Sequence, residues 1–366
     1  MKVLQTLKSD FSQTRLVSVP APSIEQNQIK LKIERFAFTA NNITYAVAGD
    51  FLKYWSFFPA LNEDGSDASA TWGQIPVWGF ARVINSNAND IAEGDRFFGY
   101  FPPSEYCVMT PTSLQHQTFI DASTHRSHLP PTYNRYRKVT GDVKPQEENE
   151  QSLLFPLFGT AHTIDDLCET KNWYEAEDAL VLSASSKTSI GVAYAMRANP
   201  DSPNSIGLTS QKNKPVVEQL GLYDAVYSYD EIGQLDAQRP CCIIDMSGNK
   251  ALLANLHRHY GENMRRTLSV GATHWSSLER NSDIIEERTE QFFAPSQFEE
   301  MAKRLGAQEF QAQLSKFIGE SCVKTREWLQ CKELGSIDEL NDVYPKICQG
   351  TMDSNLGIMV VPSKEI

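Results

Sequence analysis

Residues 178–191, D-A-L-V-L-S-A-S-S-K-T-S-I-G, constrain the fold of this chain more than any other stretch. Residues 179–182 are a short apolar run, which is typical of a strand buried on both faces. Small residues follow, and residues 190–196 have the pattern of a helix. A strand, a small-residue turn and a helix present backbone N–H groups and a positive helix end to a phosphate. The stretch predicts a phosphate-binding loop, with an ordinary buried turn as the alternative.

Gly191 is the only glycine in this loop, whereas the dinucleotide fingerprint G-x-G-x-x-G has three. Small side chains take the other places. Lys187 either supplies a charge in place of the missing glycine amides or faces water. The candidate phosphate-binding residues are Ser185, Ser186, Lys187 and Thr188.

Further strands are predicted at residues 206–210, 225–229, 241–245 and 266–271. Helical patterns separate them, and Gly221 is placed to end one of these helices. Strands that recur every ~20–30 residues with helices between them predict a doubly wound parallel sheet, an α/β fold. Several of the strands end in Gly or Ser at the carboxyl edge, where such sheets bind ligands.

The second strand of this sheet ends in hydroxyl and ammonium groups and has no acidic residue there. An acidic residue at this point would bind the ribose 2′-OH of NAD and repel a 2′-phosphate. Hydroxyls with ammonium groups favour NADPH. The alternative is that the lysines are simply solvated. The residues concerned are Thr209, Ser210, Lys212 and Lys214.

The first part of the chain predicts β structure. Residues 28–34 alternate between polar and apolar side chains, as in an antiparallel strand with one wet face. Short strands with turn signals follow, up to residue 109. Residues 124–151 are polar without periodicity, which predicts a solvated surface loop or a lid over the active site. Residues 298–317 predict one amphipathic helix.

Composition limits the remaining possibilities. A chain of 366 residues predicts two domains. The net charge of −12 disfavours nucleic acid and anionic membranes as partners. The sequence has no 18-residue apolar run and no signal-peptide pattern at its start, and its seven cysteines are scattered. We therefore expect a cytoplasmic protein with reduced thiols and a small-molecule substrate.

Several short motifs occur in the order found in one enzyme superfamily. They include G-D-R-F-F-G-Y at residues 94–100, G-T-A around Thr160, I-I-D-M-S-G ending at Gly248, S-V-G with Val270 and Gly271, and F-F-A-P with Phe292. Together they resemble the medium-chain dehydrogenase/reductase superfamily, in its quinone oxidoreductase-like branch. The resemblance spans nearly the whole chain, although the glycine-rich loop departs from the pattern.

This resemblance implies a GroES-like β domain, residues 1–152 completed by 298–366, on a Rossmann domain of residues 153–297. It implies a cofactor in the cleft and a cofactor-binding role for Thr160, Gly248, Val270, Gly271 and Phe292. The cysteine and histidine ligands of the zinc-dependent branch are missing from this sequence. The resemblance therefore implies a zinc-independent enzyme, in which hydrogen-bond donors polarise the substrate carbonyl.

Tyr45 and Asn42 are the candidate catalytic residues, because they lie near the tyrosine and asparagine of the branch's pattern. A phenol or amide can hydrogen-bond a substrate carbonyl, and a phenol can relay a proton. The alternative for Tyr45 is half-buried packing. Tyr54, Trp55, Phe57 and Phe58 either belong to the core or line an apolar pocket.

These observations lead to two hypotheses. The first is an NADPH-dependent reductase of an activated double bond or carbonyl, such as a quinone or enone. The second is a non-catalytic nucleotide-binding or structural protein that keeps the fold. We also expect a homodimer, because residues 266–270 and 291–294 would leave an apolar sheet edge exposed. In the alternative, the charged residues 281–288 shield this edge within one chain.

Overall fold

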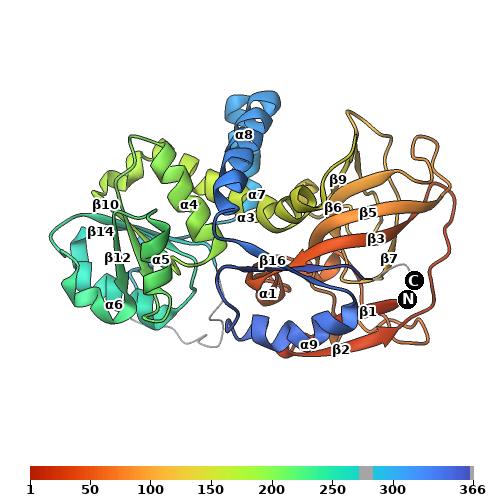
Figure 1. The fold of residues 1–366 in the computed structure, drawn as a ribbon, viewed down its shortest axis with the longest axis horizontal. Coiled ribbons are helices and arrows are strands. Elements are labelled where there is room, and N and C mark those ends of the chain that lie inside the picture. The colour runs from red at the N-terminus through yellow and green to blue at the C-terminus, as the bar shows by residue number, and fades with distance from the viewer. Residues whose placement is uncertain (272–282, 363–366) are drawn as a thin grey trace. The chain divides into compact units, whose positions relative to one another are not determined.

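The structure, a computed structural model, describes residues 1–271 and 283–362. The chain divides into two compact units (Figure 1). Unit 1 comprises Met1–Leu153 and Leu329–Ile366, and unit 2 comprises Leu154–Trp328. Residues 298–328 thus belong to unit 2, whereas the sequence assigned them to the first domain.

Unit 2 is built on a six-stranded sheet in which all paired neighbours are parallel. The strand order is β12-β11-β10-β13-β14-β15. The order therefore reverses between β10 and β13, which confirms the predicted doubly wound sheet. The strands are β10 (Asp178–Leu182), β11 (Asn204–Thr209), β12 (Ala225–Ser228), β13 (Cys241–Asp245), β14 (Met264–Ser269) and β15 (Thr289–Gln291).

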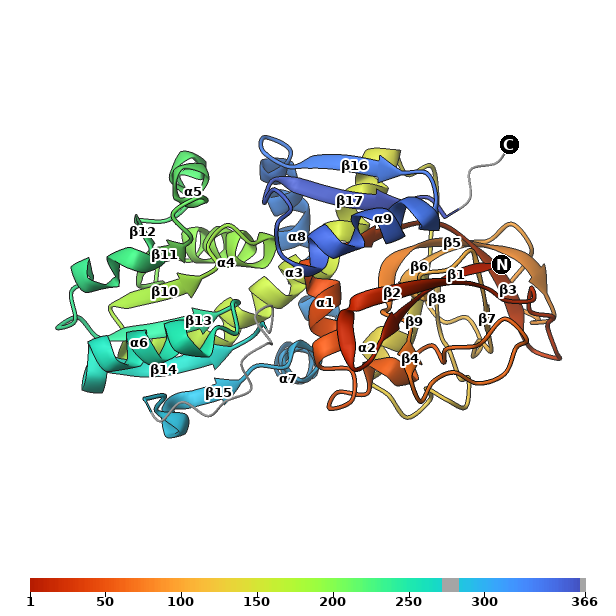
Figure 2. The ribbon, with the colours of Figure 1, turned by 90° about the horizontal axis from the view of Figure 1, so that it is seen from below.

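Helices cover both faces of this sheet (Figure 2). On one face, α3 (Pro145–Thr170), α4 (Lys187–Ala198) and α5 (Lys214–Leu220) share an apolar cluster with the strands. On the other face, α6 (Lys250–Tyr260) and the short helix η3 (Tyr229–Gln234) do the same. As predicted, α5 ends at Gly221, which has a φ of 61°.

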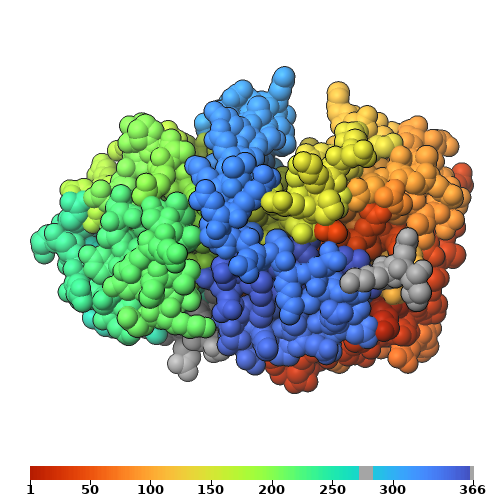
Figure 3. Space-filling model, in the orientation of Figure 1, coloured from red at the N-terminus to blue at the C-terminus, as the bar shows by residue number. Residues whose placement is uncertain are grey.

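The helix predicted at residues 298–317 is two helices, α7 (Ala294–Leu305) and α8 (Ala307–Thr325). Gly306 separates them with a φ of 86°, a conformation that a side chain would make unfavourable. Met301, Phe310 and Leu314 form a small apolar cluster between the two helices. Figure 3 shows the blue atoms of α7 and α8 beside the green atoms of unit 2. Within the described residues, no helix is both long and apolar enough to span a membrane.

Unit 1 is mostly β structure, as predicted. A three-stranded sheet has the order β2-β1-β4, and an eight-stranded sheet has the order β16-β17-β3-β5-β6-β9-β8, with β7 paired to β3. The first sheet consists of β1 (Lys2–Leu7), β2 (Asp10–Ser18) and β4 (Trp72–Gly73). The second consists of β3 (Ile29–Phe38), β5 (Val77–Ser86), β6 (Arg96–Phe101), β7 (Tyr106–Met109), β8 (Thr118–Ile120), β9 (Arg135–Lys138), β16 (Gln330–Leu334) and β17 (Leu356–Val360). Its helices are α1 (Ala40–Val47), η1 (Tyr54–Ser56), α2 (Pro131–Asn134) and α9 (Ile337–Cys348).

Residues 124–151 are not the solvated loop that the sequence predicted. They contain α2, strand β9 and the first turns of α3. Arg126 is buried in this segment, where it pairs with Asp121 and donates to the hydroxyl of Tyr136 at 3.0 Å. The polar pattern misled the prediction because this arginine is satisfied by an internal partner instead of by water.

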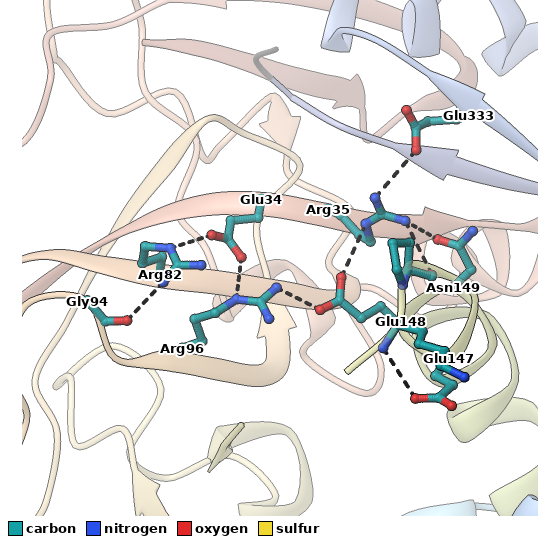
Figure 4. Close-up of polar contacts among 11 residues, drawn as sticks. Glu34, Arg35, Arg82, Gly94, Arg96, Glu147, Glu148, Asn149 and Glu333 are labelled. Carbon is teal, nitrogen blue, oxygen red and sulfur yellow. Dashed lines mark hydrogen bonds and ion pairs between the residues drawn. The ribbon is translucent and has the colours of Figure 1, made fainter. Parts of the chain in front are cut away.

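The first turn of α3 is held by ion pairs within unit 1 (Figure 4). Glu148 lies 2.8 Å from Arg96 on β6 and 3.5 Å from Arg35 on β3. Arg35 also contacts Glu333 on β16, at 3.5 Å. One buried carboxylate thus attaches the start of α3 to the eight-stranded sheet.

The edge of the parallel sheet differs from the prediction. The edge strand β15 is a short Thr-Glu-Gln segment, and its Glu290 lies 3.7 Å from Arg266. This strand is polar, so the expected apolar edge is not found there. Of the proposed shield, residues 281–282 lie outside the described residues, and Glu286–Arg288 form the short helix η5. The homodimer stays a prediction.

Candidate functional site

The candidate site of unit 2 lies at the carboxyl ends of β10 and β13. These strands are neighbours at the point where the strand order reverses. Open α/β sheets bind ligands at this point, because the loops leaving the two strands turn to opposite faces and leave space between them. Residues 183–186 follow β10, and Asp245 ends β13.

Hydroxyl groups hold the loop after β10 in shape. Ser183 has a φ of 52°, in the left-handed region that favours glycine. Ser186 is the N-cap of α4 and accepts from the N–H of Ser189 at 3.2 Å. The Ser189 hydroxyl in turn donates to the carbonyl of Leu182 at 2.9 Å. Serines thus make a tight turn here that glycines make in the fingerprint.

Gly191 keeps one function of the fingerprint's glycines. A Cβ on Gly191 would lie 2.7 Å from Cδ1 of Phe158 and 2.9 Å from Cβ of Ala161, both on α3. Only glycine therefore lets α4 approach α3 this closely. This close contact fixes the orientation of the first turn of α4.

The start of α4 suits an anion. Lys187 and Thr188, both half-buried, are its first two residues. The first N–H groups of a helix have no partner within the helix, and the helix dipole makes this end positive. Ser186 satisfies the N–H of Ser189, and the arrangement fits a phosphate of a nucleotide.

The loop after β11 is attached to the loop after β10. The hydroxyl of Thr209 donates to that of Ser185 at 3.4 Å, and the side-chain amide of Asn213 donates to it at 3.0 Å. The hydroxyl of Ser210 accepts from the backbone N–H of Asn213 at 3.3 Å. Lys212 is exposed on the same loop. The structure therefore brings together the predicted residues from the ends of β10 and β11.

Lys214 has a partner that sequence reasoning missed. Its ammonium Nζ lies 2.7 Å from Oε2 of Glu231, in η3 directly after β12. The sequence showed no acidic residue at the end of β11. The structure brings one there from η3, which follows the neighbouring strand β12.

The ends of β13 and β14 form one tight backbone arrangement. Oδ1 of Asp245 accepts from the N–H of Ser247 at 2.8 Å and from that of Gly248 at 3.1 Å. The N–H groups of Val270 and Gly271 donate to the carbonyl of Asp245 at 2.9 and 3.1 Å. A Cβ on Gly271 would lie 2.1 Å from the carbonyl oxygen of Met246, so the close approach requires glycine. Gly248, Val270 and Gly271 thus lie at the carboxyl edge, as predicted.

Two predicted cofactor-binding side chains have other contacts. The hydroxyl of Thr160 donates to the carbonyl of Pro156 in its own helix, at 2.8 Å. The ring of Phe292 is buried in the apolar cluster on the α3–α5 face. The structure gives Phe292 a packing role. Its N–H donates to the carbonyl of Ser269, which ends β14.

In unit 1, the side chain of Asn42 has a structural role. Its Oδ1 accepts from the N–H of Thr39 at 2.7 Å, which completes the capping box at the start of α1. Its Nδ2 donates to the carbonyl of Pro76 at 2.8 Å. Both ends of the amide are therefore engaged in the fold, and these contacts use one of the two N–H groups of Nδ2. The catalytic role of Asn42 stays a prediction.

Tyr45 lies in a buried cluster of aromatic rings. Its hydroxyl accepts from Nε1 of Trp78 at 3.4 Å, and its ring centroid lies 4.7 Å from that of Tyr54 and 5.6 Å from that of Tyr100. Burial raises the pKa of Tyr45 to about 12, so the phenol is protonated at neutral pH. The tyrosine cluster, as we call it, consists of Tyr45, Tyr54, Tyr100, Tyr133, Phe57 and Trp78.

The hydroxyls of the tyrosine cluster differ in their bonding. Those of Tyr54 and Tyr133 lie 2.8 Å apart and bond to each other. The hydroxyl of Tyr100 is buried and has no hydrogen-bond partner among the described residues. Tyr133 comes from α2, in the segment predicted to be a loop. Tyr54 and Phe57 are buried, which agrees with the alternative that these rings belong to the core.

Across residues 1–271 and 283–362, no three His, Cys, Asp or Glu side chains are grouped so that they could hold a metal ion. Zinc independence stays a prediction.

Residues 36–353 match a family described as "Protein of unknown function (DUF2855)". The chain belongs to the DUF2855 family. No curated protein matches the sequence of this DUF2855 chain.

Solved structures show the fold to which this DUF2855 chain is similar. One is CurA from Vibrio vulnificus in complex with NADPH, with 12% identity, a TM-score of 0.63 and coverage of 96% of this chain and 95% of CurA. Another is the mycobacterial protein Rv1454c complexed with NADPH, with 13% identity, a TM-score of 0.56 and coverage of 99% and 100%. A third, described as an NADPH:quinone reductase, comes from Bacillus thuringiensis, with 12% identity, a TM-score of 0.57 and coverage of 98% of each chain. The fold implied by the resemblance to medium-chain dehydrogenases is therefore confirmed for this DUF2855 chain.

Sequence reasoning missed three residues of the site in this DUF2855 chain. Tyr229 accepts from the N–H of Ser183 at 3.2 Å and so supports the left-handed residue of the loop. Asn213 joins two loops, and Glu231 pairs with Lys214. Only Glu231 had a local signal, because Ser228-x-x-Glu231 is the pattern of a capping box.

Proposed function

We propose that this chain is an NADPH-dependent oxidoreductase that reduces an activated double bond or carbonyl, as in a quinone or enone, without zinc. NADPH supplies the hydride when it is bound. The reaction also needs one proton, which a phenol or water can give. The substrate is a small molecule.

The observation that carries this proposal is the carboxyl edge at the reversal of the strand order. The start of α4, the serine turn before it and the attached loop after β11 together offer N–H groups, hydroxyls and a cation. Such donors suit the phosphates of a dinucleotide. The similar structures whose descriptions name NADPH support the same choice of ligand.

Each group has a defined task in this proposal. The N–H groups at the start of α4 hold the pyrophosphate, and Ser186 keeps that end of the helix in place. Thr209, Ser210 and Lys212 bind the adenosine ribose and its 2′-phosphate. Tyr45, protonated at neutral pH, donates to the oxygen on which charge develops. Tyr45 carries the main catalytic role, because the side chain of Asn42 also holds the capping box of α1.

The burial of Tyr45 favours the second candidate function. The side chain is 6% exposed, and its hydroxyl already accepts from Trp78. A protein that binds the dinucleotide but turns nothing over would have this arrangement. In that case the tyrosine cluster is a packed core and the carboxyl edge a nucleotide-binding site.

One experiment separates the two functions. Purified protein is titrated with NADPH by fluorescence, and NADPH oxidation is then followed with a panel of quinones and enones. Binding with turnover of at least one compound supports the reductase. Binding without turnover across the panel supports the non-catalytic protein. Absence of NADPH binding contradicts both. Chelator-treated protein should keep any activity, and activity that needs added zinc would contradict the zinc-independent proposal.

A further inference from the structure

The register of the parallel sheet brings Lys214 and Glu231 together. Strands β11 and β12 pair so that Thr209 lies beside Ser228. Lys214 is the first residue of α5, shortly after β11, and Glu231 lies three residues beyond Ser228. Both side chains therefore belong to the same carboxyl edge. Their charged atoms lie 2.7 Å apart.

Glu231 is fixed more firmly than a surface glutamate. The same oxygen that meets Lys214 also accepts from the N–H of Ser228 at 2.7 Å, as part of the capping box of η3. The Lys214 and Glu231 side chains are 20% and 25% exposed. The hydrogen bond between them lowers the pKa of Glu231 and raises that of Lys214, so both stay charged at neutral pH.

A 2′-phosphate at this edge would compete with Glu231 for Lys214. The phosphate is anionic and attracts an ammonium group, but here the ammonium already has an anionic partner. Glu231 also repels the phosphate directly. NADH has no 2′-phosphate, so neither effect changes its binding.

We propose that Glu231 sets the coenzyme preference by restraining Lys214, so that it weakens the binding of NADPH and leaves that of NADH unchanged. This inference rests on the proposed function, in which the dinucleotide binds at this edge. Lys212, which is exposed on the same loop, then provides most of the preference for NADPH over NADH. Lys214 contributes strongly only when Glu231 has lost its charge.

The test compares Glu231→Gln with a matched control, Glu218→Gln. Glutamine at 231 still accepts from Ser228, because a capping box takes Glu or Gln, so the variant removes only the charge. Glu218 also faces Lys214, but at 3.9 Å and with 52% exposure. Dissociation constants for NADPH and NADH are measured by fluorescence titration, and thermal unfolding confirms that each variant is folded.

We expect Glu231→Gln to lower the dissociation constant of NADPH about fivefold, the effect of one surface ion pair. That of NADH should stay within about twofold, and Glu218→Gln should change neither. Most of the tightening should be lost in Glu231→Gln/Lys214→Gln, since its larger part acts through the ammonium. If Glu231→Gln leaves NADPH binding unchanged, or tightens both coenzymes equally, the inference is overturned.

A second arm uses Lys214→Gln in the otherwise unchanged chain, which is informative even if Glu231→Gln is unstable. Because Glu231 already holds the ammonium of Lys214, Lys214→Gln should weaken NADPH binding by less than about twofold. Lys212→Gln should weaken NADPH binding by about tenfold. A tenfold loss from Lys214→Gln would show that the ammonium is already available, and would contradict the inference. Wild-type protein that binds neither coenzyme would instead refute the proposed function.

Discussion

Glu148, at the start of α3, lies 2.8 Å from the guanidinium of Arg96 on β6, and its side chain is only 8% exposed (Figure 4). The same carboxylate lies 3.5 Å from Arg35. A buried acid between two arginines fixes the start of a long helix through charge. Loss of that charge would leave the guanidinium groups of Arg35 and Arg96 without this buried partner.

Replacement of Glu148 by Ala should therefore lower the free energy of unfolding by about 3 kcal/mol, because the arginines lose a buried partner. Chemical denaturation of the full chain measures this change. Glu147→Gln is the control. Glu147 is exposed one residue earlier, and its substitution should change stability by less than about 0.5 kcal/mol. Equal effects of the two substitutions would show that the ion pairs do not hold the helix.

Gly191 should tolerate no side chain. An alanine would place its Cβ 2.7 Å from Phe158, so α4 must move away from α3, at a cost of about 1–3 kcal/mol. The start of α4 would shift with it, and NADPH binding should weaken. Gly319→Ala in α8 is the control, since a Cβ there meets nothing within 4 Å. That variant should gain about 0.5–1 kcal/mol. Stabilisation by Gly191→Ala would contradict the close helix contact.

Ser183 occupies a backbone conformation that suits glycine, with a φ of 52°. Ser183→Gly should change stability by less than about 0.5 kcal/mol, because relief of strain offsets the greater freedom of the unfolded chain. Ser183→Val should cost at least about 1 kcal/mol, because a β-branched side chain disfavours this region. Thermal unfolding of the two variants checks the order. A valine variant as stable as the glycine variant would be evidence against the left-handed turn.

Asp165 on α3 makes stability depend on pH. Burial, followed by the nearby charge of Glu169, raises its pKa from 3.8 to about 7. In the unfolded chain the carboxyl loses its proton near pH 4, whereas in the folded chain it keeps it until about pH 7. Between these values the unfolded state binds fewer protons, so this group lowers stability as pH rises and its effect levels off above about pH 7.

Asp165→Asn should therefore be more stable than the wild type by about 2 kcal/mol at pH 8 and nearly equal to it at pH 4. Urea denaturation at several pH values measures the difference. Asp166→Asn is the control, because Asp166 is half-buried, pairs with Arg304 and is the smallest of the causes that raise the pKa of Asp165. It should cost no more than about 1 kcal/mol and leave most of the pH dependence in place. A pH profile unchanged by Asp165→Asn would refute the assignment.

Tyr45→Phe should lower kcat by roughly 100-fold or more if the phenol gives the proton, and should leave the dissociation constant of NADPH nearly unchanged. Tyr54→Phe is the matched control, since it removes a hydroxyl from the same tyrosine cluster that bonds to Tyr133. It should change kcat by less than about threefold. Equal losses in the two variants would mean that the cluster acts through packing alone.

Local patterns predicted the parallel sheet because its central strands, β10 and β13, are buried along their whole length and are therefore almost continuously apolar. Gly221 predicted the end of α5 because a helix often ends at a residue in the left-handed conformation, which favours glycine and is therefore a local signal. The same reasoning failed at Gly306, since an amphipathic pattern continues across a break in the backbone. It failed at Arg126 because the burial of a charge depends on a partner, Asp121, and not on the arginine itself.

The sequence predicted those residues of the candidate site that lie at or just beyond the end of a strand. It did not predict the residue that only the pairing of neighbouring strands brings to the site. Ser185 lies in the loop after β10 and Thr209 ends β11, so their place at the carboxyl edge followed from the order of elements. Glu231 reaches Lys214 through the pairing of β11 with β12, which no local pattern encodes. Asn42 was predicted from a motif, but the same residue type completes a helix cap, and the motif alone does not distinguish the two roles.

The tyrosine cluster also gives unit 1 an optical signature. Phenol and indole rings held at fixed mutual angles, such as Tyr100 and Trp78 at 5.1 Å, give near-ultraviolet circular dichroism that disappears when side-chain packing is lost. The unlabelled chain thus reports on its own tertiary order in the region around Tyr45. A variant that fails to turn over substrate but keeps this signal has lost chemistry, whereas one that loses both has lost its packed interior.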